Sequence, residues 1–405
     1  MDPIKPIEQL DAGWPVVAPA DVGIAAGALH ALDERQPIDQ PWLDSLVIVR
    51  HGKLAWESYY NGTDRSTPHE LKSATKSVFA ILAGAAVDRG IISLDTRLDE
   101  HLGVYLDREG VDRRKGRITF GDCLRMASGL EWGANDERAM RWLTCPDPVA
   151  FTLSSEQRVV AEPGTRRNYS SADSQLAAAC LALGAGGSLT ELADEWLLGP
   201  IGAHGWRWLG RRHAVLGQEL ELAGSELQMR PVDHARIGQL VLQHGRWEGR
   251  QLVSEQWMRL MTTPQEGVDL PTAEQAVALG QHPIQAVKTG YGLHWWMGSL
   301  GGHDALMATG FGGQYCFVVP SLELVVVHHA RLFHEPELIE LLEDGIRQGV
   351  VDEFGRQVGP GGAEWSLRIG SRMRELRAGK EVSDGLVGGL LLLDQVIVPA
   401  VQKHA

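Results

Sequence analysis

The stretch "SATKSVFAILAGAAVDRG", residues 73–90, has apolar residues at helical spacing and ends at Gly90. This pattern predicts an apolar helix with a glycine at its C-terminal end. Ser73 and Lys76 stand three residues apart at its start. On a helix this spacing puts the amine one turn beyond the hydroxyl, on the same face.

The pair Ser73 and Lys76 indicates nucleophilic catalysis. A serine hydroxyl does not ionise unaided at neutral pH, but a neighbouring amine can take its proton if burial or a nearby cation lowers the pKa of that amine. The start of a helix also adds positive potential, which favours an alkoxide and a developing oxyanion. A chance S-x-x-K is common in a chain of this size, so the pair needs support from a second element.

The segment "PGTRRNYSSADSQLAAACLA" supplies that second element. Tyr169 lies on a predicted loop just before a helical run, from which its hydroxyl can reach between Ser73 and Lys76. The flanking Arg166 and Arg167 could lower the pKa of this tyrosine if they point inward. The structural alternative is an ordinary core tyrosine in a loop.

Strand patterns lie on both sides of a long helical middle. "SLVIVRHGKLAWESYYNG" (45–62) predicts a hairpin around His51-Gly52. After residue 290, "YGLHWWM", "ALMAT", "QYCFVVP" and "LELVVVHHA" are short strand-like runs between tight turns. Such runs favour an antiparallel sheet, and helical periodicity dominates residues 95–260.

The predicted fold class is therefore α/β, of the α+β type, with an antiparallel β-sheet flanked by helices plus an all-helical lobe. Residues 1–95 and 260–350 form the discontinuous sheet domain, and residues 96–259 form the mainly helical lobe. Residues 351–405 are a C-terminal extension whose apolar end, 384–401, is expected to be a packed helix.

These pieces, in this order, resemble the serine β-lactamase and penicillin-binding-protein superfamily over roughly residues 40–350. Within it the chain looks most like class C β-lactamases, β-lactamase-like carboxylesterases and 6-aminohexanoate-dimer hydrolases. The matching segments are "VIVRHGKLAWESYYNG", "KSATKSVFAILAGAAVDRGIISLDTRLDEHLG", "ITFGDCLRMASGLEW", "EPGTRRNYSSAD", "YGLHWWMG" and "ATGFGGQYCFVVPSLELVVV". The resemblance implies a β-lactamase/transpeptidase-like fold.

The resemblance also implies catalytic roles. Ser73 would be the acylated nucleophile and Lys76 its base or proton store. Tyr169 would be the relay that activates Ser73 and later helps to protonate the leaving group. Ser171 stands where many relatives have Asn, so it keeps a hydrogen-bonding group for substrate but shortens its reach.

Two tripeptides compete for the third motif, Lys288-Thr289-Gly290 and Ala308-Thr309-Gly310. In the family this motif precedes further glycines, a strand, a Pro-containing turn and a very apolar strand, a context that fits 308–310. Gly310 would let the substrate backbone approach. The amide of Phe311 would then complete an oxyanion hole with the amide of Ser73.

Ala308 then stands where β-lactam-binding relatives place a lysine or histidine near the substrate carboxylate. We therefore expect a serine hydrolase that cleaves carboxylic esters or small linear amides through an acyl-enzyme. The alternatives are a β-lactamase or D-alanyl-peptide hydrolase and, in another class, a non-catalytic binding protein of the same fold. Trp132 and Trp142 either line the cleft or pack within the lobe, and His303-Asp304 either contacts substrate or forms a turn.

Composition sets the remaining expectations. The chain has 405 residues and a formal charge of −14, which disfavours nucleic acid and anionic membranes as partners. Neither a signal peptide nor an 18-residue apolar run is evident in the sequence, so we expect a cytoplasmic enzyme with reduced cysteines. No cofactor motif occurs, and "HHARLFH" (328–334) is read as strand-end and turn histidines, not as a metal site. The expected partner is a small-molecule ester or amide; oligomeric state is left open.

Overall fold

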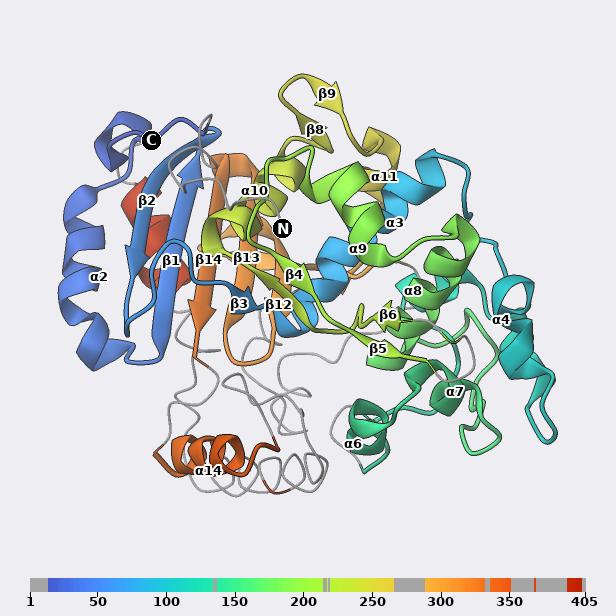
Figure 1. Cartoon of the computed structure of the whole chain (residues 1–405). Helices are drawn as coiled ribbons and strands as arrows, with labels where there is room; N and C mark the ends of the chain where they lie inside the picture. Colours follow the sequence, from blue (N-terminus) through green and yellow to red (C-terminus); the bar gives the residue numbers. More distant parts are fainter. Residues whose placement is uncertain are drawn as a thin grey trace.

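The computed structural model describes residues 14–133, 137–213, 217, 219–265, 288–331, 336–350, 368 and 392–402. Its centre is a seven-stranded sheet in the order β10-β11-β12-β13-β14-β1-β2 (Figure 1). Each neighbouring pair is antiparallel. The strands are β1 (Leu43–Arg50), β2 (Lys53–Tyr59), β10 (Lys288–Tyr291), β11 (Trp296–Leu300), β12 (His303–Gly310), β13 (Gln314–Val319) and β14 (Leu324–Ala330).

The sheet brings together strands from the N-terminal and C-terminal parts of the chain. The predicted hairpin is β1–β2, and its two turn residues, His51 and Gly52, have φ of 52° and 71°. Positive φ at both positions suits the tight turn that a right-handed twisted hairpin requires. β1 pairs along its length with β14, so the hairpin extends the C-terminal strands instead of forming a separate sheet.

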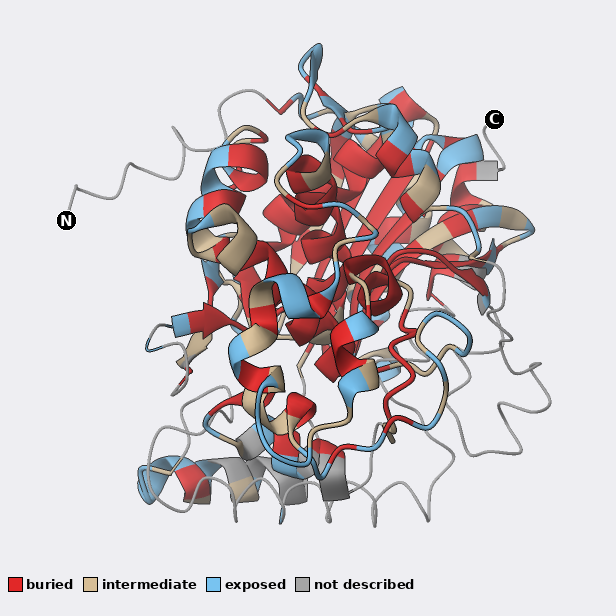
Figure 2. Cartoon of the chain, turned by 90° about the vertical axis from the view of Figure 1, so that its right-hand side faces the viewer, coloured by how far each residue is buried: buried red, intermediate tan, exposed pale blue. Residues whose placement is uncertain are grey.

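Helices cover both faces of the sheet, which explains why β1, β13 and β14 are buried along their whole length. One face packs against α3 (Thr75–Asp88) and α10 (Pro231–Leu242). The other packs against α2 (Ala26–Asp39) and the C-terminal residues η6 (Leu393–Ile397) and α17 (Val398–Gln402). Figure 2 shows the buried residues running through the sheet and the helices next to it.

The close approach of α10 depends on a glycine. A β-carbon at Gly238 would lie 2.4 Å from Val325 Cγ1 and 2.7 Å from Cys316 Sγ. Both contacts are far inside van der Waals distance, so α10 can lie on β13 and β14 only with this bare position.

The lobe between the two halves of the sheet is mainly helical. Its helices are α4 (Leu98–Leu106), α5 (Phe120–Leu124), α6 (Glu137–Thr144), α7 (Pro148–Leu153), α8 (Ser171–Ala185), α9 (Leu189–Ala193), η4 (Asp194–Leu198) and α11 (Glu255–Met261). Strands of two or three residues accompany them: β3 (His69–Glu70), β4 (Arg207–Trp208), β5 (Gly210–Arg212), β6 (Glu219–Glu221), β7 (Leu227–Met229), β8 (Arg246–Trp247) and β9 (Arg250–Gln251). These strands are too short to leave a period in the sequence.

Helix α14 (Pro336–Arg347) follows the last strand of the sheet. In the described part of the chain, no single helix has the length and apolarity to cross a bilayer; α8 with α9–η4, bent by 81°, meets that measure only as a pair.

Candidate active site

Ser73 lies where a short strand turns into the long apolar helix. β3 ends at Glu70, the turn η2 spans Lys72–Ala74, and α3 follows at once. Lys72, the residue before Ser73, has a φ of 50°, which is uncommon for a side chain other than glycine. The amide of Leu71 donates to the carbonyl of Leu227 at 2.8 Å, so strand β7 holds the entry to this turn. Ser73 itself remains partly exposed.

Lys76 lies under Ser73 with only 1% of its surface exposed. Its Nζ donates to Ser73 Oγ at 3.0 Å and to the carbonyl of Gly224 at 2.6 Å. Burial lowers the pKa of Lys76 from 10.5 to about 7. Near neutral pH a large share of this amine is therefore unprotonated and can accept a proton from Ser73.

Tyr169 reaches the same point from the loop before α8. Its hydroxyl hydrogen-bonds with Ser73, and its ring centroid lies 5.2 Å from Lys76 Nζ. Burial raises the pKa of Tyr169 to about 12, which outweighs the opposing effects of Ser73 and Arg167. Of the two flanking arginines, Arg167 does lower this pKa, but desolvation is the larger cause and the net shift is upward. Arg166 is exposed and Arg167 is half-buried.

The loop that carries Tyr169 is fixed by contacts that the sequence did not predict. Ser170 accepts a hydrogen bond from the Asp173 amide at 3.2 Å and so caps the start of α8. The buried Asp173 carboxylate accepts from Ser128 Oγ at 2.8 Å and from the Ser128 amide at 3.2 Å. Burial raises the pKa of Asp173 to about 7. The sequence signals for the contact between Ser128 and Asp173 are limited to the S-G-L turn at 128–130 and the aspartate in the first turn of α8.

Strand β12, which ends at Gly310, lies beside the turn that holds Ser73. A β-carbon on Gly310 would lie 2.1 Å from the Leu71 carbonyl oxygen, so the end of β12 touches the turn that holds Ser73. Phe311 follows directly, with its side chain 37% exposed. By contrast, Lys288-Thr289-Gly290 begins the edge strand β10, two strands from β12. The nearest atom to a β-carbon on Gly290 would be Pro264 Cγ, at 3.1 Å.

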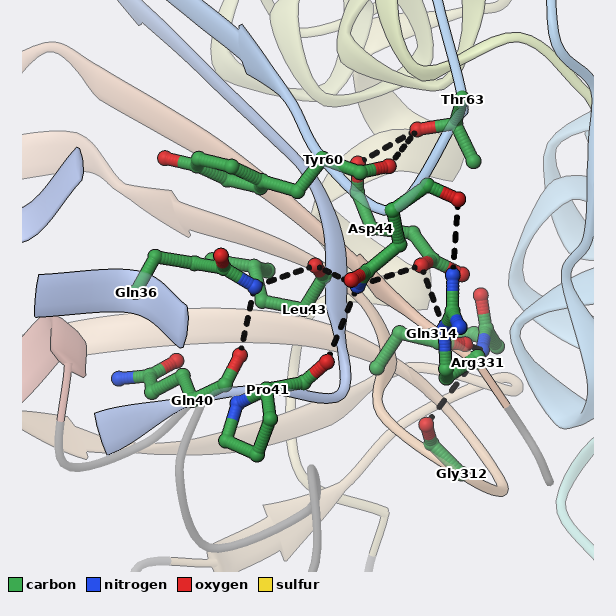
Figure 3. A network of polar contacts seen from close by, with 12 residues as sticks. Gln36, Gln40, Pro41, Leu43, Asp44, Tyr60, Thr63, Gly312, Gln314 and Arg331 are labelled. Carbon is green, nitrogen blue, oxygen red and sulfur yellow. Dashed lines mark hydrogen bonds and ion pairs between the residues drawn. The ribbon is translucent and has the colours of Figure 1, made fainter. Parts of the chain in front are cut away.

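The loop after Gly310 has its own supports. His328 Nδ1 lies 2.8 Å from the carbonyl of Gly313, to which it donates. Gln314 Nε2 donates to the carbonyl of Ala330 at 2.5 Å and to that of Gly312 at 3.4 Å (Figure 3). These bonds hold the backbone that follows β12 in one conformation.

The other predicted contacts fall in three places. Ser171 begins α8 and packs against Gly224, whose β-carbon would lie 3.0 Å from that of Ser171. The part-exposed Trp132 has its carbonyl held by Asn168 and meets the buried Trp142 edge-on at 5.6 Å. His303 begins β12 at the end opposite Gly310, with Nδ1 2.8 Å from Ser321 Oγ.

Histidines 328 and 329 lie buried in β14, whereas His334 lies outside the described residues. Among the described residues, no group of three or more His, Cys, Asp or Glu side chains is arranged to hold a metal ion.

Comparisons with known proteins agree with this architecture. No curated protein matches the sequence. A candidate 6-aminohexanoate-dimer hydrolase from Bacillus anthracis has a similar structure, with a TM-score of 0.59, 18% identity and coverage of 91% of this chain and 89% of that one. An octameric penicillin-binding protein homologue from Pyrococcus abyssi has a TM-score of 0.58, 17% identity and coverage of 80% and 78%. EstCE1, a hydrolase with promiscuous acyltransferase activity, has a TM-score of 0.58, 16% identity and coverage of 75% and 93%.

At these identities the likeness shows a shared fold. The sequence itself matches the family described as Beta-lactamase over residues 44–349, which is most of the chain. That range holds the seven-stranded sheet except Leu43, the first residue of β1, and every residue placed around Ser73 above. The chain therefore belongs to the Beta-lactamase family, a family of hydrolases.

Proposed function

We propose that this protein is a serine hydrolase that cleaves carboxylic esters or small linear amides. The observation that carries the proposal is the 3.0 Å contact between Ser73 Oγ and the buried Lys76 Nζ. A hydroxyl beside an amine of pKa about 7 is the arrangement that nucleophilic catalysis needs.

In the proposed acylation step, Ser73 Oγ attacks the substrate carbonyl carbon and gives its proton to the neutral Lys76. The backbone amides of Ser73 and Phe311 hold the oxyanion that forms. The bond to the alcohol or amine then breaks, and the proton reaches that leaving group through the Tyr169 hydroxyl. The missing side chain at Gly310 lets β12 lie directly against the turn that holds Ser73. We propose that substrate binds along β12 and contacts Ser171 and Trp132.

In deacylation, water attacks the ester between Ser73 and the acyl group. Lys76, with Tyr169, takes a proton from that water. The carbon–oxygen bond to Ser73 breaks, and the proton returns to Ser73 Oγ. The same two residues thus serve both half-reactions.

Two points support esters and linear amides as the substrate class. Ala308 is buried in β12, at the position where the family resemblance implies a cation in β-lactam-binding relatives. Among the structural neighbours are the candidate 6-aminohexanoate-dimer hydrolase and the hydrolase with acyltransferase activity. We further propose a small-molecule substrate for an enzyme that works in the cytoplasm, with neither nucleic acid nor membrane as a partner.

The test is a panel of a p-nitrophenyl ester, a 6-aminohexanoate dimer and a chromogenic cephalosporin. Each is assayed with the wild type and with Ser73→Ala. We expect turnover of the ester or the dimer that Ser73→Ala abolishes, and a phosphonate adduct whose mass maps to the peptide containing Ser73.

Other outcomes assign other functions. Rapid cephalosporin turnover with little esterase activity would identify a β-lactamase or D-alanyl-peptide hydrolase. The absence of both turnover and phosphonate labelling would identify a binding protein. Activity that survives Ser73→Ala would exclude Ser73 as the nucleophile.

A further inference from the structure

Three aromatic rings and a guanidinium group meet on the side of Ser73 where Tyr169 lies. The Tyr169 ring stacks on Trp296 at 5.7 Å and meets Tyr291 edge-on at 6.2 Å. The Arg167 guanidinium carbon lies 5.1 Å from the Tyr291 centroid and 5.4 Å from that of Trp296. Arg167 and Tyr169 therefore share one aromatic platform (the rings of Tyr291 and Trp296), and Tyr169 joins that platform to Ser73.

The charge of Arg167 is not neutralised within the described part of the chain. No described residue forms an ion pair or a side-chain hydrogen bond with it, and its Nη1 is buried without a hydrogen-bond partner. Burial lowers the pKa of Arg167, and the groups that oppose this shift are Tyr291 and Tyr169, not a carboxylate. The buried Arg230, by contrast, pairs with Asp233, as the high cost of a buried unpaired charge would suggest.

A bound anion would complete this arrangement. A guanidinium presents five N–H donors in a planar fork that matches a carboxylate. Contacts with two rings restrict the guanidinium group, so less side-chain entropy is lost when an anion binds. The half-buried position makes the hydrogen bonds stronger than they would be in water.

We propose that Arg167 binds a carboxylate on the leaving-group half of the substrate. The inference rests on the proposed hydrolase function, in which Tyr169 delivers the proton to the leaving group. Arg167 lies on the side of Tyr169, so a carboxylate carried by the departing alcohol or amine comes within its reach. The resemblance places a cation on the third motif in β-lactam-binding relatives, where this chain has Ala308. Arg167 would supply that cation from the loop before α8.

The experiment compares two esters with one acyl group, 4-acetoxybenzoate and its methyl ester, which differ in the charge of the leaving group. The measured quantity is the ratio of kcat/KM for the charged ester to that for the neutral one. Arg167→Gln should lower this ratio by roughly ten- to a hundredfold, the loss typical of one charge-assisted pair. Arg167→Lys should restore part of it. The matched control is Arg166→Gln, which removes the same charge from the exposed neighbour and should leave the ratio within about twofold.

A binding measurement avoids dependence on leaving-group chemistry. With the neutral ester as reporter, hexanoate should inhibit the wild type more strongly than hexanamide, and Arg167→Gln should remove that difference. An equal loss of activity on both esters would overturn the inference and assign Arg167 to the support of Tyr169. A wild type that hydrolyses the neutral ester through Ser73 without preferring the charged one would also overturn it, while the proposed hydrolase function stands. A wild type that hydrolyses neither would overturn both.

Discussion

Among the residues that the structure describes, two lysines are buried, Lys76 and Lys115. Lys115 is fully buried and donates to the carbonyl of Ser154 at 2.5 Å, and burial lowers its pKa to about 8. Lys115 Nζ donates to the backbone carbonyls of Thr152 and Ser154, which have no proton to give. Lys76 has a similar burial and a similar carbonyl contact, but it also touches a hydroxyl. A lowered pKa alone therefore does not identify a candidate catalytic amine; Lys76 is proposed for that role because a serine hydroxyl lies beside it.

The titration of Lys76 predicts the pH profile of hydrolysis. The neutral amine is the active form, so kcat/KM for a neutral ester should rise about tenfold per pH unit below pH 7 and level off above it. Tyr169 does not contribute between pH 6 and 9, because its pKa of about 12 keeps it protonated. Initial rates across pH 6 to 9 measure this curve. A rate that falls as pH rises through 7 would contradict Lys76 as the base.

The position of the turn that contains Ser73 (Lys72–Ala74) depends on how closely strand β12 approaches it. The carbonyl of Leu71 occupies the space where a side chain at position 310 would begin. Any β-carbon there must push β12 away from the turn, and the amide of Phe311 moves with the strand. The geometry of the turn is thus set by a contact between segments far apart in sequence.

Gly310→Ala should therefore lower kcat/KM by roughly a hundredfold or more, the range seen when one oxyanion donor is lost. Circular dichroism and the melting temperature show whether the variant still folds. The matched control is Lys288→Ala in the competing tripeptide, two strands away, which should stay within a few-fold of wild type. The assignment of the third wall would be reversed if Lys288→Ala abolished activity and Gly310→Ala did not.

Local patterns predicted the long elements well and the contacts between elements poorly. The periods in residues 45–62 and 73–90 lie close to the hairpin β1–β2 and to helix α3. The two- and three-residue strands of the lobe have no detectable period. The bond between Ser128 and Asp173 and the stacking of Arg167 on Trp296 join residues that only tertiary structure brings together. The proposed catalytic residues were accessible from the sequence because they lie in motifs; the residues that support them do not.

Buried histidines lie where strand β14 of the sheet meets helix α10 and strand β3. They are His329 in β14, His234 in α10 and His69 in β3. His234 Nδ1 is 2.9 Å from His329 Nε2, and the rings of His69 and His329 are 4.8 Å apart. Burial lowers the pKa of His69 to about 4 and that of His234 to about 3. The nearby charge of Arg331 adds to the shift of His69. All three residues are therefore neutral in the folded protein at neutral pH.

This set predicts that the protein unfolds in mild acid. Between pH 6.5 and about 4, His69 binds a proton in the unfolded chain but stays neutral in the folded one. The free energy of unfolding therefore falls as pH falls. Each histidine contributes about 1.4 kcal/mol per pH unit in that window. Asp173 acts in the opposite direction, because its folded pKa of about 7 lies above its unfolded value and it loses stability as pH rises from 3.8 to 7.

Burial also raises the pKa of Asp44 and of Asp233, so three carboxyl groups act in this direction. The histidines with a lowered pKa are His69, His234, His294, His328 and His329. These five outnumber the three carboxyl groups, so the melting temperature should drop from pH 7 to pH 5. Thermal melts across that range measure the drop, and His69→Gln should make it shallower. A melting temperature that does not change over this range would contradict the neutral state of these histidines.

The pairing of β1 with β14 has a consequence for synthesis of the chain. Val49 lies opposite Val325, about 280 residues later. At the 5–20 residues per second typical of a ribosome, the hairpin β1–β2 waits roughly 15 to 60 s for its partner strand to emerge. During that time the backbone N–H and C=O groups of β1 that β14 will pair with are open to other chains. We therefore expect the emerging polypeptide to be prone to aggregation until its last sheet strands leave the ribosome.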